Sequence, residues 1–213
     1  MKAAREMGVF ERAAHGQGYR FIAGIDEAGR GPLAGPVIAA AVILPPAYEY
    51  PGINDSKKLS PRQRESLYEV IARDAVAIGI GVVEAPVIDA VNILQATLTA
   101  MKEAVLCLSP LPDYLLIDGL KGISVAIPQE TIVGGDGRSI SVASASIVAK
   151  VSRDRIMVMY HRQFPQYNFL KNKGYGTQEH REAILKYGRC KLHRNSFRFA
   201  DGDDPQTEFP LGF

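Results

Sequence analysis

The chain has 213 residues, of which 46% are hydrophobic and 23% are charged, and its formal net charge is +2. These values are ordinary for a soluble globular protein, and the length fits one domain with a sizeable core. No apolar run reaches the roughly 18 to 20 residues that cross a membrane, and the two cysteines lack CxxC spacing, so we expect a cytoplasmic protein with reduced thiols.

Apolar runs bounded by turn residues predict five strands, at 19–26, 36–44, 76–83, 114–117 and 129–133. Helical periodicity, with Ser60 as an N-cap before Pro61, predicts helices at 1–18, 61–74, 86–108, 139–160 and 178–187. The first three strands favour an antiparallel meander, and the strand–helix units after them favour parallel pairing. The sequence therefore predicts an α/β fold, with a mixed five-stranded sheet flanked by helices.

The one plausible internal boundary lies near Phe164, after which the chain becomes basic and aromatic. We expect residues 1–164 to form the main domain and residues 165–213 to form a basic helical extension packed on it as one compact unit. Between positions 171 and 198 there are eight Lys or Arg residues, opposed only by Glu179 and Glu182. This segment is either a basic face for a polyanion or a solvated helix surface.

The most informative stretch is GIDEAGRGPLAGPV, at residues 24–37. An apolar strand delivers the neighbouring acids Asp26 and Glu27, and carboxylates at such a place must be paired, metal-bound or solvated. Gly29 and Gly31 allow the backbone to approach a ligand closely, and Arg30 between them suits bidentate recognition of a phosphate. Together these residue types indicate an active site.

Adjacent residues of a regular strand point to opposite faces, which raises a geometric question about Asp26 and Glu27. One alternative is that the strand breaks at Glu27, which Gly29 would permit. The other is that the two carboxylates serve different metal ions or different sides of the site.

Asp118 ends a second strand, and it would converge with Asp26 if the two strands are parallel neighbours. Clustered carboxylates repel one another, and an all-oxygen ligand set favours Mg²⁺ or Mn²⁺. The alternative for Asp118 is a turn after the strand. Asp154 lies between two arginines on a predicted helix, and it is either a fourth acid of the site or part of a salt-bridged surface.

Six segments stand out along the chain: GIDEAGRGPLAGPV (24–37), DSKKLS (55–60), LLIDG (115–119), SASIVAKVSRDRIM (144–157), NKGYGT (172–177) and HRNSF (193–197). Together they resemble ribonuclease HII, the prokaryotic type 2 ribonuclease H family. They occur in the family's order over residues 20–198, and the first is highly specific. The resemblance implies an RNase H-like fold and places the family's metal-site acids on Asp26, Glu27, Asp118 and Asp154.

The resemblance implies an RNA/DNA hybrid, or duplex DNA with a single ribonucleotide, as the substrate. It implies two-metal-ion hydrolysis on the 5′ side of the ribonucleotide, which leaves a 3′-hydroxyl and a 5′-phosphate. Gly29, Arg30 and Gly31 would recognise the ribose 2′-OH, and the ring of Tyr175 would pack on the neighbouring deoxyribose. Without the resemblance, Tyr175 would be read as a loop tyrosine packed on its own domain.

Lys57, Arg194 and Ser196 match family positions suited to phosphate contact, although isolated basic loop residues are usually solvated. The sequence leaves three roles open for His193: a proton carrier, a loop residue bonded to the backbone, or a phosphate contact.

The alternatives to ribonuclease HII are a type 3 ribonuclease H, a DNA junction resolvase and a non-catalytic nucleic-acid-binding protein. Residues 206–213 carry three apolar side chains on a polar tail, which could pack back on the domain, dangle or dock on a replication clamp. We expect a monomer.

Overall fold

The computed structural model describes residues 7–53, 56 and 59–199. Its centre is a five-stranded sheet in the order β3-β2-β1-β4-β5. The first three strands pair antiparallel, and β1, β4 and β5 pair parallel, which confirms the predicted mixed sheet. The strands are β1 (Ile22–Ala28), β2 (Val37–Ile43), β3 (Ala77–Val83), β4 (Tyr114–Asp118) and β5 (Gln129–Ile132).

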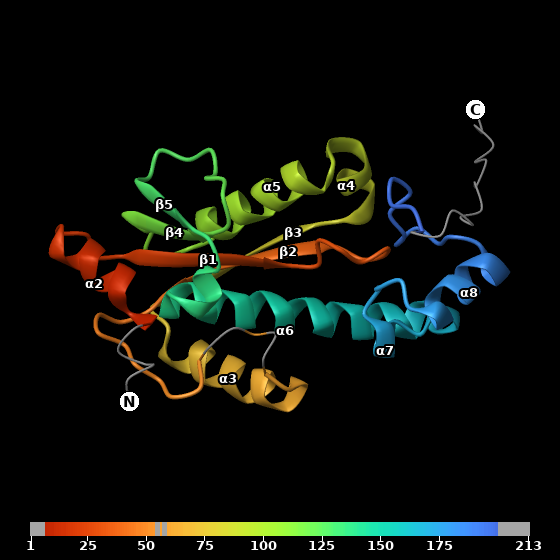
Figure 1. Cartoon of the computed structure of the whole chain (residues 1–213), viewed down its shortest axis with the longest axis horizontal. Coiled ribbons are helices and arrows are strands. Elements are labelled where there is room, and N and C mark those ends of the chain that lie inside the picture. Colours follow the sequence, from red (N-terminus) through yellow and green to blue (C-terminus); the bar gives the residue numbers. More distant parts are fainter. Residues whose placement is uncertain (1–6, 54–55, 57–58, 200–213) are drawn as a thin grey trace.

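Helices cover both faces of the sheet (Figure 1). Helices α4 and α5 lie on one face, whereas α6 lies on the other with α3 outside it, so the molecule is layered. The helices are α2 (Val9–Gly16), α3 (Pro61–Asp74), α4 (Ala85–Val91), α5 (Ile93–Leu106), α6 (Ile140–Gln163), α7 (Phe169–Asn172) and α8 (Gln178–Tyr187), with short 3-10 turns η2 (Gly135–Gly137) and η3 (Pro165–Tyr167).

Strand β2 is buried over its whole length because both of its faces are covered. Ala39 and Ala41 belong to the apolar cluster beneath α5, and the alternate residues Ala40 and Val42 belong to the cluster beneath α6. The continuous apolar run that predicted this strand therefore reflects two cores, one on each side of the sheet.

Glycines on β3 allow α5 to lie unusually close to the sheet. A Cβ atom on Gly79 would lie 2.0 Å from the carbonyl oxygen of Ala104, and one on Gly81 would lie 2.0 Å from that of Ala100. These two residues therefore act by leaving room for a helix backbone.

The single helix predicted over residues 86–108 is wrong, because the chain breaks at Asn92. Asn92 has φ 71°, and its side-chain oxygen accepts hydrogen bonds from the amides of Leu94 and Gln95 at 3.0 and 3.1 Å. An asparagine tolerates this left-handed conformation and caps the next helix. The apolar periodicity continues across the break, which is why the pattern alone did not locate it.

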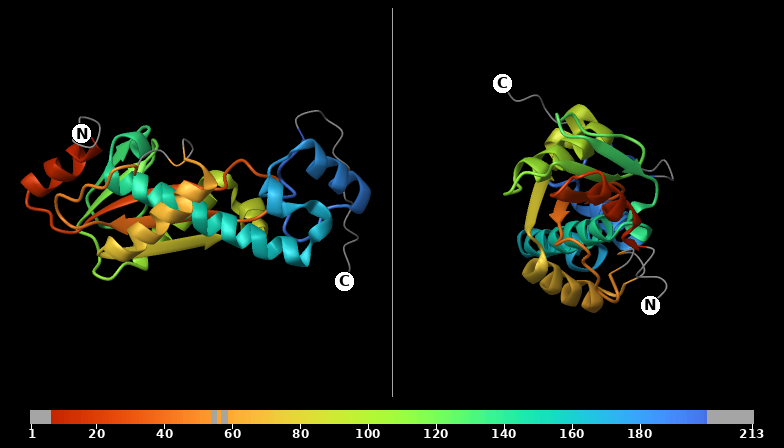
Figure 2. Two further views of the ribbon diagram at one scale, coloured as in Figure 1. Left: turned by 90° about the horizontal axis from the view of Figure 1, so that it is seen from below. Right: turned by 90° about the vertical axis from the view of Figure 1, so that its left-hand side faces the viewer.

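Helix α6 extends beyond the sheet and carries the segment after residue 164 at its far end (Figure 2). Phe169 and Ile184 of that segment share an apolar cluster with Met157 of α6 and with Leu33 and Ala34. The loop after β1 is thus packed against the C-terminal segment. None of the helices in the described residues combines the length and the hydropathy of a membrane span.

Candidate active site

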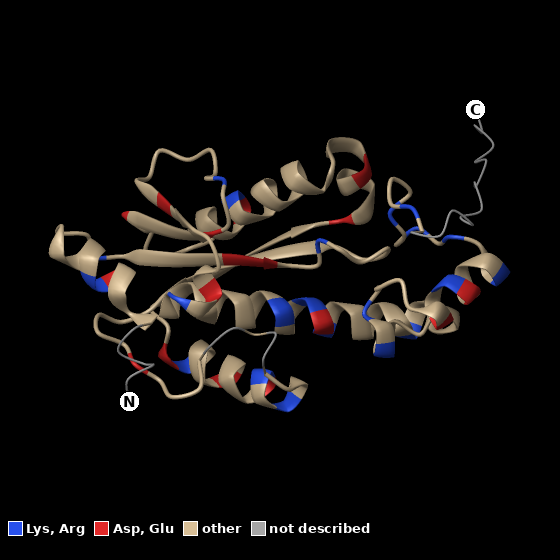
Figure 3. Ribbon diagram, in the orientation of Figure 1, with Lys and Arg blue, Asp and Glu red and all other residues tan. Residues whose placement is uncertain are grey.

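The parallel pairing of β1 with β4 places two acids at the same edge of the sheet. Ile25 lies opposite Ile117, so Asp26 and Asp118, which follow them, leave the sheet at the same level. The condition set by the sequence, that the two strands are neighbours, is met. Figure 3 shows the acidic residues of β1 near the middle of the molecule, above α6.

Asp26 is a buried carboxylate, with 4% of its surface exposed. Its Oδ1 accepts a hydrogen bond from the amide of Glu27 at 2.7 Å, and the Ser146 side chain of α6 also binds it. Burial raises the pKa of Asp26 well above its ordinary value, and the nearby charges of Glu27 and Asp118 raise it further. A cation bound at this point would offset the repulsion and favour the charged carboxylate.

Glu27 remains part of a regular strand, since β1 stays paired with β2 through Ala28. Its side chain therefore leaves the sheet on the face opposite to that of Asp26. Its Oε1 accepts a hydrogen bond from Arg30 at 3.1 Å, and it lines a second pocket together with Asp118 and Met101 of α5. Of the two alternatives, the unbroken strand favours acids on different sides of the sheet edge, and both Glu27 and Asp118 border the two pockets.

One pocket gathers most of the residues that the sequence singled out. Three acids from the ends of β1 and β4 line it, together with the loop after β1 and Tyr175. Basic and hydroxyl side chains complete its wall. The lining residues are Asp26, Glu27, Ala28, Gly29, Arg30, Gly31, Ser56, Arg64, Asp118, Ser146, Lys150 and Tyr175.

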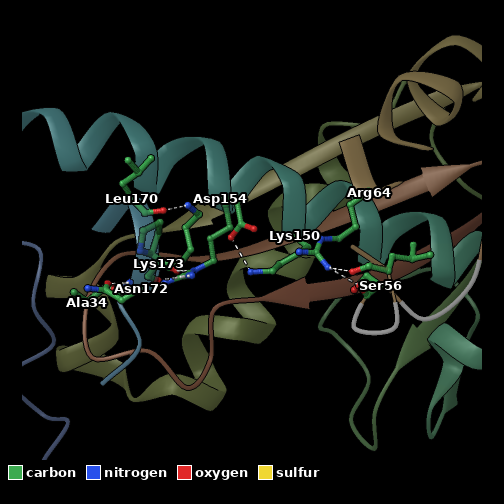
Figure 4. A network of polar contacts seen from close by, with 12 residues as sticks. Ala34, Ser56, Arg64, Lys150, Asp154, Leu170, Asn172 and Lys173 are labelled. Atoms are coloured by element: carbon green, nitrogen blue, oxygen red, sulfur yellow. Dashed lines mark hydrogen bonds and ion pairs between the residues drawn. The ribbon is translucent and has the colours of Figure 1, made fainter. Parts of the chain in front are cut away.

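Asp154 does not join the other three acids in this pocket. It lines an adjoining pocket, and its Oδ1 accepts a hydrogen bond from Lys150 at 2.7 Å (Figure 4). Eight residues of helix separate Asp154 from Ser146, the neighbour of Asp26, which corresponds to about 12 Å along the axis. Its contacts match the salt-bridged alternative better than a fourth site acid.

Asp136 is an acid that the sequence analysis missed. It lies in η2, directly after β5, and only 7% of its surface is exposed. The amide of the preceding Gly135 donates a hydrogen bond to Asp118 Oδ1 at 2.7 Å. The available signal was its position after a third parallel strand, which brings it to the same sheet edge as Asp26 and Asp118.

The loop after β1 requires its first glycine. Gly29 has φ +97°, and a Cβ atom there would lie 2.1 Å from Arg153 Nε. Tyr175 stands beside this loop with 45% of its surface exposed, and its Cε1 would lie 3.9 Å from a Cβ atom on Gly31. The guanidinium carbon of Arg153 lies 5.9 Å from the centre of the tyrosine ring. The ring is thus held at the pocket wall with one side open to solvent.

Arg194 is fully buried, and its placement argues against direct phosphate contact. Its guanidinium donates hydrogen bonds to the carbonyl oxygens of Gly29, Arg30 and Gly35 at 2.5 to 3.0 Å. Burial, and to a lesser extent the nearby charge of Arg153, lowers the pKa of Arg194 to about 9. Arg194 therefore supports the loop from behind.

The structure places Ser196 and His193 away from the pocket, and it does not describe Lys57. Ser196 donates its hydroxyl to Asp89 Oδ1 at 2.6 Å, on the exposed surface, and it is not among the pocket-lining residues. Lys57 lies outside the described residues. His193 is buried and accepts a hydrogen bond from the amide of Cys190 at 2.9 Å, which matches the backbone-bonded alternative.

The basic segment is used partly inside the protein. Arg181 donates to the carbonyl oxygen of Gly176, and Arg189 donates to those of Arg194 and Phe197. These side chains fix loops, so the charge of this segment overstates the size of any basic face.

The pocket suits hard divalent cations by its donor chemistry. Asp26, Glu27 and Asp118 offer carboxylate oxygens. The pKa of Asp26 is raised first by burial and then by the charges of Glu27 and Asp118, and a cation would offset that repulsion. Within the described part of the chain, no three acidic, histidine or cysteine side chains are already assembled closely enough to hold an ion.

A mixed sheet of this order, with carboxylates at the ends of two neighbouring parallel strands, is the arrangement expected of an RNase H-like nuclease. The sequence profile of the ribonuclease HII family matches residues 23–200. The chain is 71% identical to the ribonuclease HII of Syntrophus aciditrophicus (strain SB) over 189 residues, which is 89% of each chain. It therefore belongs to the ribonuclease HII family and is a ribonuclease H, an endonuclease.

Solved structures agree with this fold. The ribonuclease HII in the PCNA:RNase HII complex from Archaeoglobus fulgidus is similar, with a TM-score of 0.71 and 25% identity over 84% of this chain and 96% of that one. Bst ribonuclease HIII in complex with Mn²⁺ has a TM-score of 0.64 and 20% identity over 90% of this chain and 67% of that one. The second relative extends well beyond the matched part.

Proposed function

We propose that this ribonuclease cleaves the RNA strand of RNA/DNA hybrids and cuts on the 5′ side of single ribonucleotides embedded in duplex DNA. The products would be a 3′-hydroxyl and a 5′-phosphate, and the role would be removal of ribonucleotides from DNA. The observation that carries this proposal is the pocket, where three carboxylates, the Gly29–Gly31 loop and Tyr175 share one wall.

Divalent ions, Mg²⁺ or Mn²⁺, would supply an activated water and would stabilise the departing 3′-oxygen, as two-metal sites do. Asp26, Glu27 and Asp118 would hold them. We further propose Asp136 as the fourth acid in place of Asp154. Asp136 is buried next to the hydrogen-bond partner of Asp118, whereas Asp154 is neutralised by Lys150 in the adjoining pocket.

The protein's own groups would orient the substrate. Gly31 is exposed and has no side chain, so its backbone polar groups are accessible, whereas Gly29 is buried and its carbonyl oxygen already accepts from Arg194. Backbone groups of the Gly29–Gly31 loop that face the pocket would bond the ribose 2′-OH as donor and acceptor. The exposed ring of Tyr175 would pack against the next deoxyribose. Arg30 and Lys150, which line the same pocket, would attract the phosphates on either side.

The decisive experiment is a cleavage assay on a labelled DNA duplex that contains one ribonucleotide, with Mg²⁺, with Mn²⁺ and with EDTA. We expect a single metal-dependent cut on the 5′ side of the ribonucleotide and no cut in the same duplex made only of DNA. Asp26→Asn should abolish cleavage while the duplex still binds. Cutting of branched DNA without ribose would instead favour a junction resolvase, and binding without cleavage would favour a non-catalytic protein.

Docking on a replication clamp through residues 206–213 stays a proposal, since this tail lies outside the described residues. A ribonuclease HII from Archaeoglobus fulgidus has been solved in complex with PCNA, which supports testing it. Deleting residues 206–213 should remove clamp binding and leave cleavage of the short duplex unchanged. The monomeric state and the cytoplasmic location stay predictions.

A further inference from the structure

Two histidines outside the pocket form a buried pair in the C-terminal segment. His180 lies on α8 and His193 follows that helix, and they are 0% and 2% exposed. Their Nε2 atoms lie 3.1 Å apart, and the aromatic rings of Tyr167 and Phe169 surround them. Burial lowers the pKa of both imidazoles, that of His193 to about 3, so both rings are neutral near pH 7.

The hydrogen bonds assign each proton of this pair. The amide of Cys190 donates to His193 Nδ1 at 2.9 Å, so that nitrogen is the acceptor and the proton of the neutral ring is on Nε2. His193 Nε2–H then donates to His180 Nε2, which leaves the proton of His180 on Nδ1. A longer contact of 3.3 Å joins His193 Nδ1 to the Cys190 carbonyl, but the amide is an obligatory donor and decides the tautomer.

The chain of hydrogen bonds ends at the tyrosine of the pocket. His180 Nδ1–H donates to the carbonyl oxygen of Tyr175 at 2.9 Å. The amide of Tyr175 is fixed by the Asn172 carbonyl at 2.9 Å, and the Tyr175 carbonyl also accepts from Thr177 at 2.8 Å. The backbone that sets the direction of the Tyr175 ring is therefore held from the interior by His180.

Arg194, the residue next to His193, holds the Gly29–Gly31 loop, which lines the same pocket as Tyr175. Arg194 donates to the carbonyl oxygens of Gly29 and Arg30, and its own amide donates to that of Leu33 at 2.8 Å. His193 also forms an isolated β-bridge with Ala34. The dipeptide His193–Arg194 thus binds the glycine loop directly through Arg194, and it is linked to Tyr175 by the hydrogen bonds of His193 and His180.

We propose that His193 and His180 are positioning residues that set the spacing between Tyr175 and the Gly29–Gly31 loop, and so determine how strongly the enzyme prefers a junction between ribose and deoxyribose. Neither imidazole touches the pocket. The proposal rests on the proposed function, because it assigns these residues to the recognition of that substrate.

The test is a double-mutant cycle on the full-length protein. His180→Gln places an amide near the former Nε2, so it can still bind His193 but does not reach the Tyr175 carbonyl. We expect it to lower kcat/KM for the single-ribonucleotide duplex by about tenfold, because small displacements of a recognition group carry large rate costs. In a Tyr175→Ala background, the same substitution should change kcat/KM less than about twofold, since the ring it positions is absent.

Two matched variants separate positioning from a general loss of structure. His180→Asn puts an amide near the former Nδ1 and can keep the bond to Tyr175, so it should retain more of the junction preference than His180→Gln, even if it melts lower. His15→Gln removes an equivalent bond, from His15 Nδ1 to the Tyr19 carbonyl at 2.9 Å, on α2, and should leave the preference unchanged.

Equal losses from His180→Gln in both backgrounds would overturn the proposal, and so would a preference that simply follows the melting temperature across the variants. If Tyr175→Ala alone left cleavage at the junction unchanged, the proposed recognition by Tyr175 would fail instead, and the positioning role would fail with it. The first two outcomes contradict only the positioning role and leave the proposed substrate unaffected. Failure of the positioning role can therefore be distinguished from failure of the proposed recognition by Tyr175.

Discussion

Asp26 and Glu27 are neighbours in the chain but face opposite sides of the sheet edge. Asp26 contacts α6 through Ser146, and Glu27 faces the pocket beside α5. Glu27 and Asp118 each border both pockets, and Asp26 borders only the first of them. The substrate phosphate would therefore approach this edge of the sheet end-on, where carboxylates from both faces are within reach.

Replacing Asp26 by Asn should stabilise the metal-free protein. The pKa of Asp26 is raised because its charged form is buried beside two other carboxylates, and the neutral amide keeps an oxygen to accept from the Glu27 amide. We expect the free energy of unfolding to rise by about 1 to 2 kcal/mol at pH 7.5 in EDTA, measured by urea denaturation. A variant less stable than the wild type would show that the charge of Asp26 is compensated in the folded protein.

The two candidates for the fourth acid can be separated by a matched pair of substitutions. Asp136→Asn should reduce cleavage at saturating Mg²⁺ by about 100-fold or more, the scale of losing a group that stabilises charge in the transition state. Asp154→Asn should stay within about fivefold of the wild type, because it removes an ion pair with Lys150. The reverse order would restore Asp154 as the site acid.

Part of the site could be predicted because its signals are local. Acids after apolar strands and glycines around Arg30 can be recognised from neighbouring residues alone. Asp136, the proposed fourth acid, was missed because its place near Asp118 depends on which strand lies beside β4. The sequence did not indicate that Arg194 is buried, because a basic residue in a loop is usually solvated, and here three backbone carbonyl oxygens replace the water. Contacts between distant segments carry this information.

At the scale of elements, the approach of α6 to β1 depends on Gly24. A Cβ atom there would lie 2.1 Å from the backbone carbon of Ser141 and 2.3 Å from the amide nitrogen of Val142, so neither neighbour is a flexible side chain. The helix whose Ser146 contacts Asp26 is positioned by this close contact.

Gly24→Ala should therefore destabilise the protein by about 3 kcal/mol or more, since the helix backbone must move away from the sheet. Gly16→Ala is the control, because no atom lies within 4 Å of a Cβ there and the residue ends α2. That change should be neutral or stabilising by about 0.5 kcal/mol. Urea denaturation of both variants checks the pair, and equal effects would contradict the packing argument.

Helices and strands could be predicted closely wherever a single local signal, such as a capping box or an apolar run, determines them. Ser60 and Gln63 form the capping box that begins α3, and all five strands form where apolar runs predicted them. The break at Asn92 escaped because a single side chain overrides a continuing apolar pattern. Strand order was open until pairing was known, since it depends on long-range contacts.

At the scale of the whole molecule, the C-terminal segment is joined to the sheet domain by more than its covalent link. Its apolar cluster includes Leu33 and Ala34 from the loop after β1, and Arg153 of α6 donates to the carbonyl oxygens of Ala34 and Lys173. We therefore keep the prediction of one compact unit with a boundary near Phe164.

The stability of this unit should fall in mild acid. The unfolded imidazoles bind protons near pH ~6.5, whereas burial keeps the folded His193 neutral down to a pKa of about 3 and also lowers the pKa of His180. The unfolded state thus binds more protons below pH 6.5, and each such proton costs about 1.4 kcal/mol of stability per pH unit.

Urea denaturation between pH 7.5 and 4.5 measures this slope. In His193→Gln, the free energy of unfolding should fall less steeply as the pH is lowered, by about the 1.4 kcal/mol per pH unit that corresponds to one proton. Asp26, whose pKa is raised, acts in the opposite direction in both proteins, so the difference between the two slopes removes its contribution. Identical slopes would show that the histidines are not the groups that titrate.

Arg153 and Arg194 have a consequence for how the substrate arrives. Both guanidinium groups are buried behind the Gly29–Gly31 loop and are bound by peptide carbonyl oxygens. Dipoles of this kind orient the groups without cancelling their charge, and the low dielectric around them lets their field extend toward the pocket. We therefore expect an enzyme with a net charge of only +2 to keep a local attraction for the proposed polyanionic substrate, one that acts on the rate of encounter and weakens as salt is added.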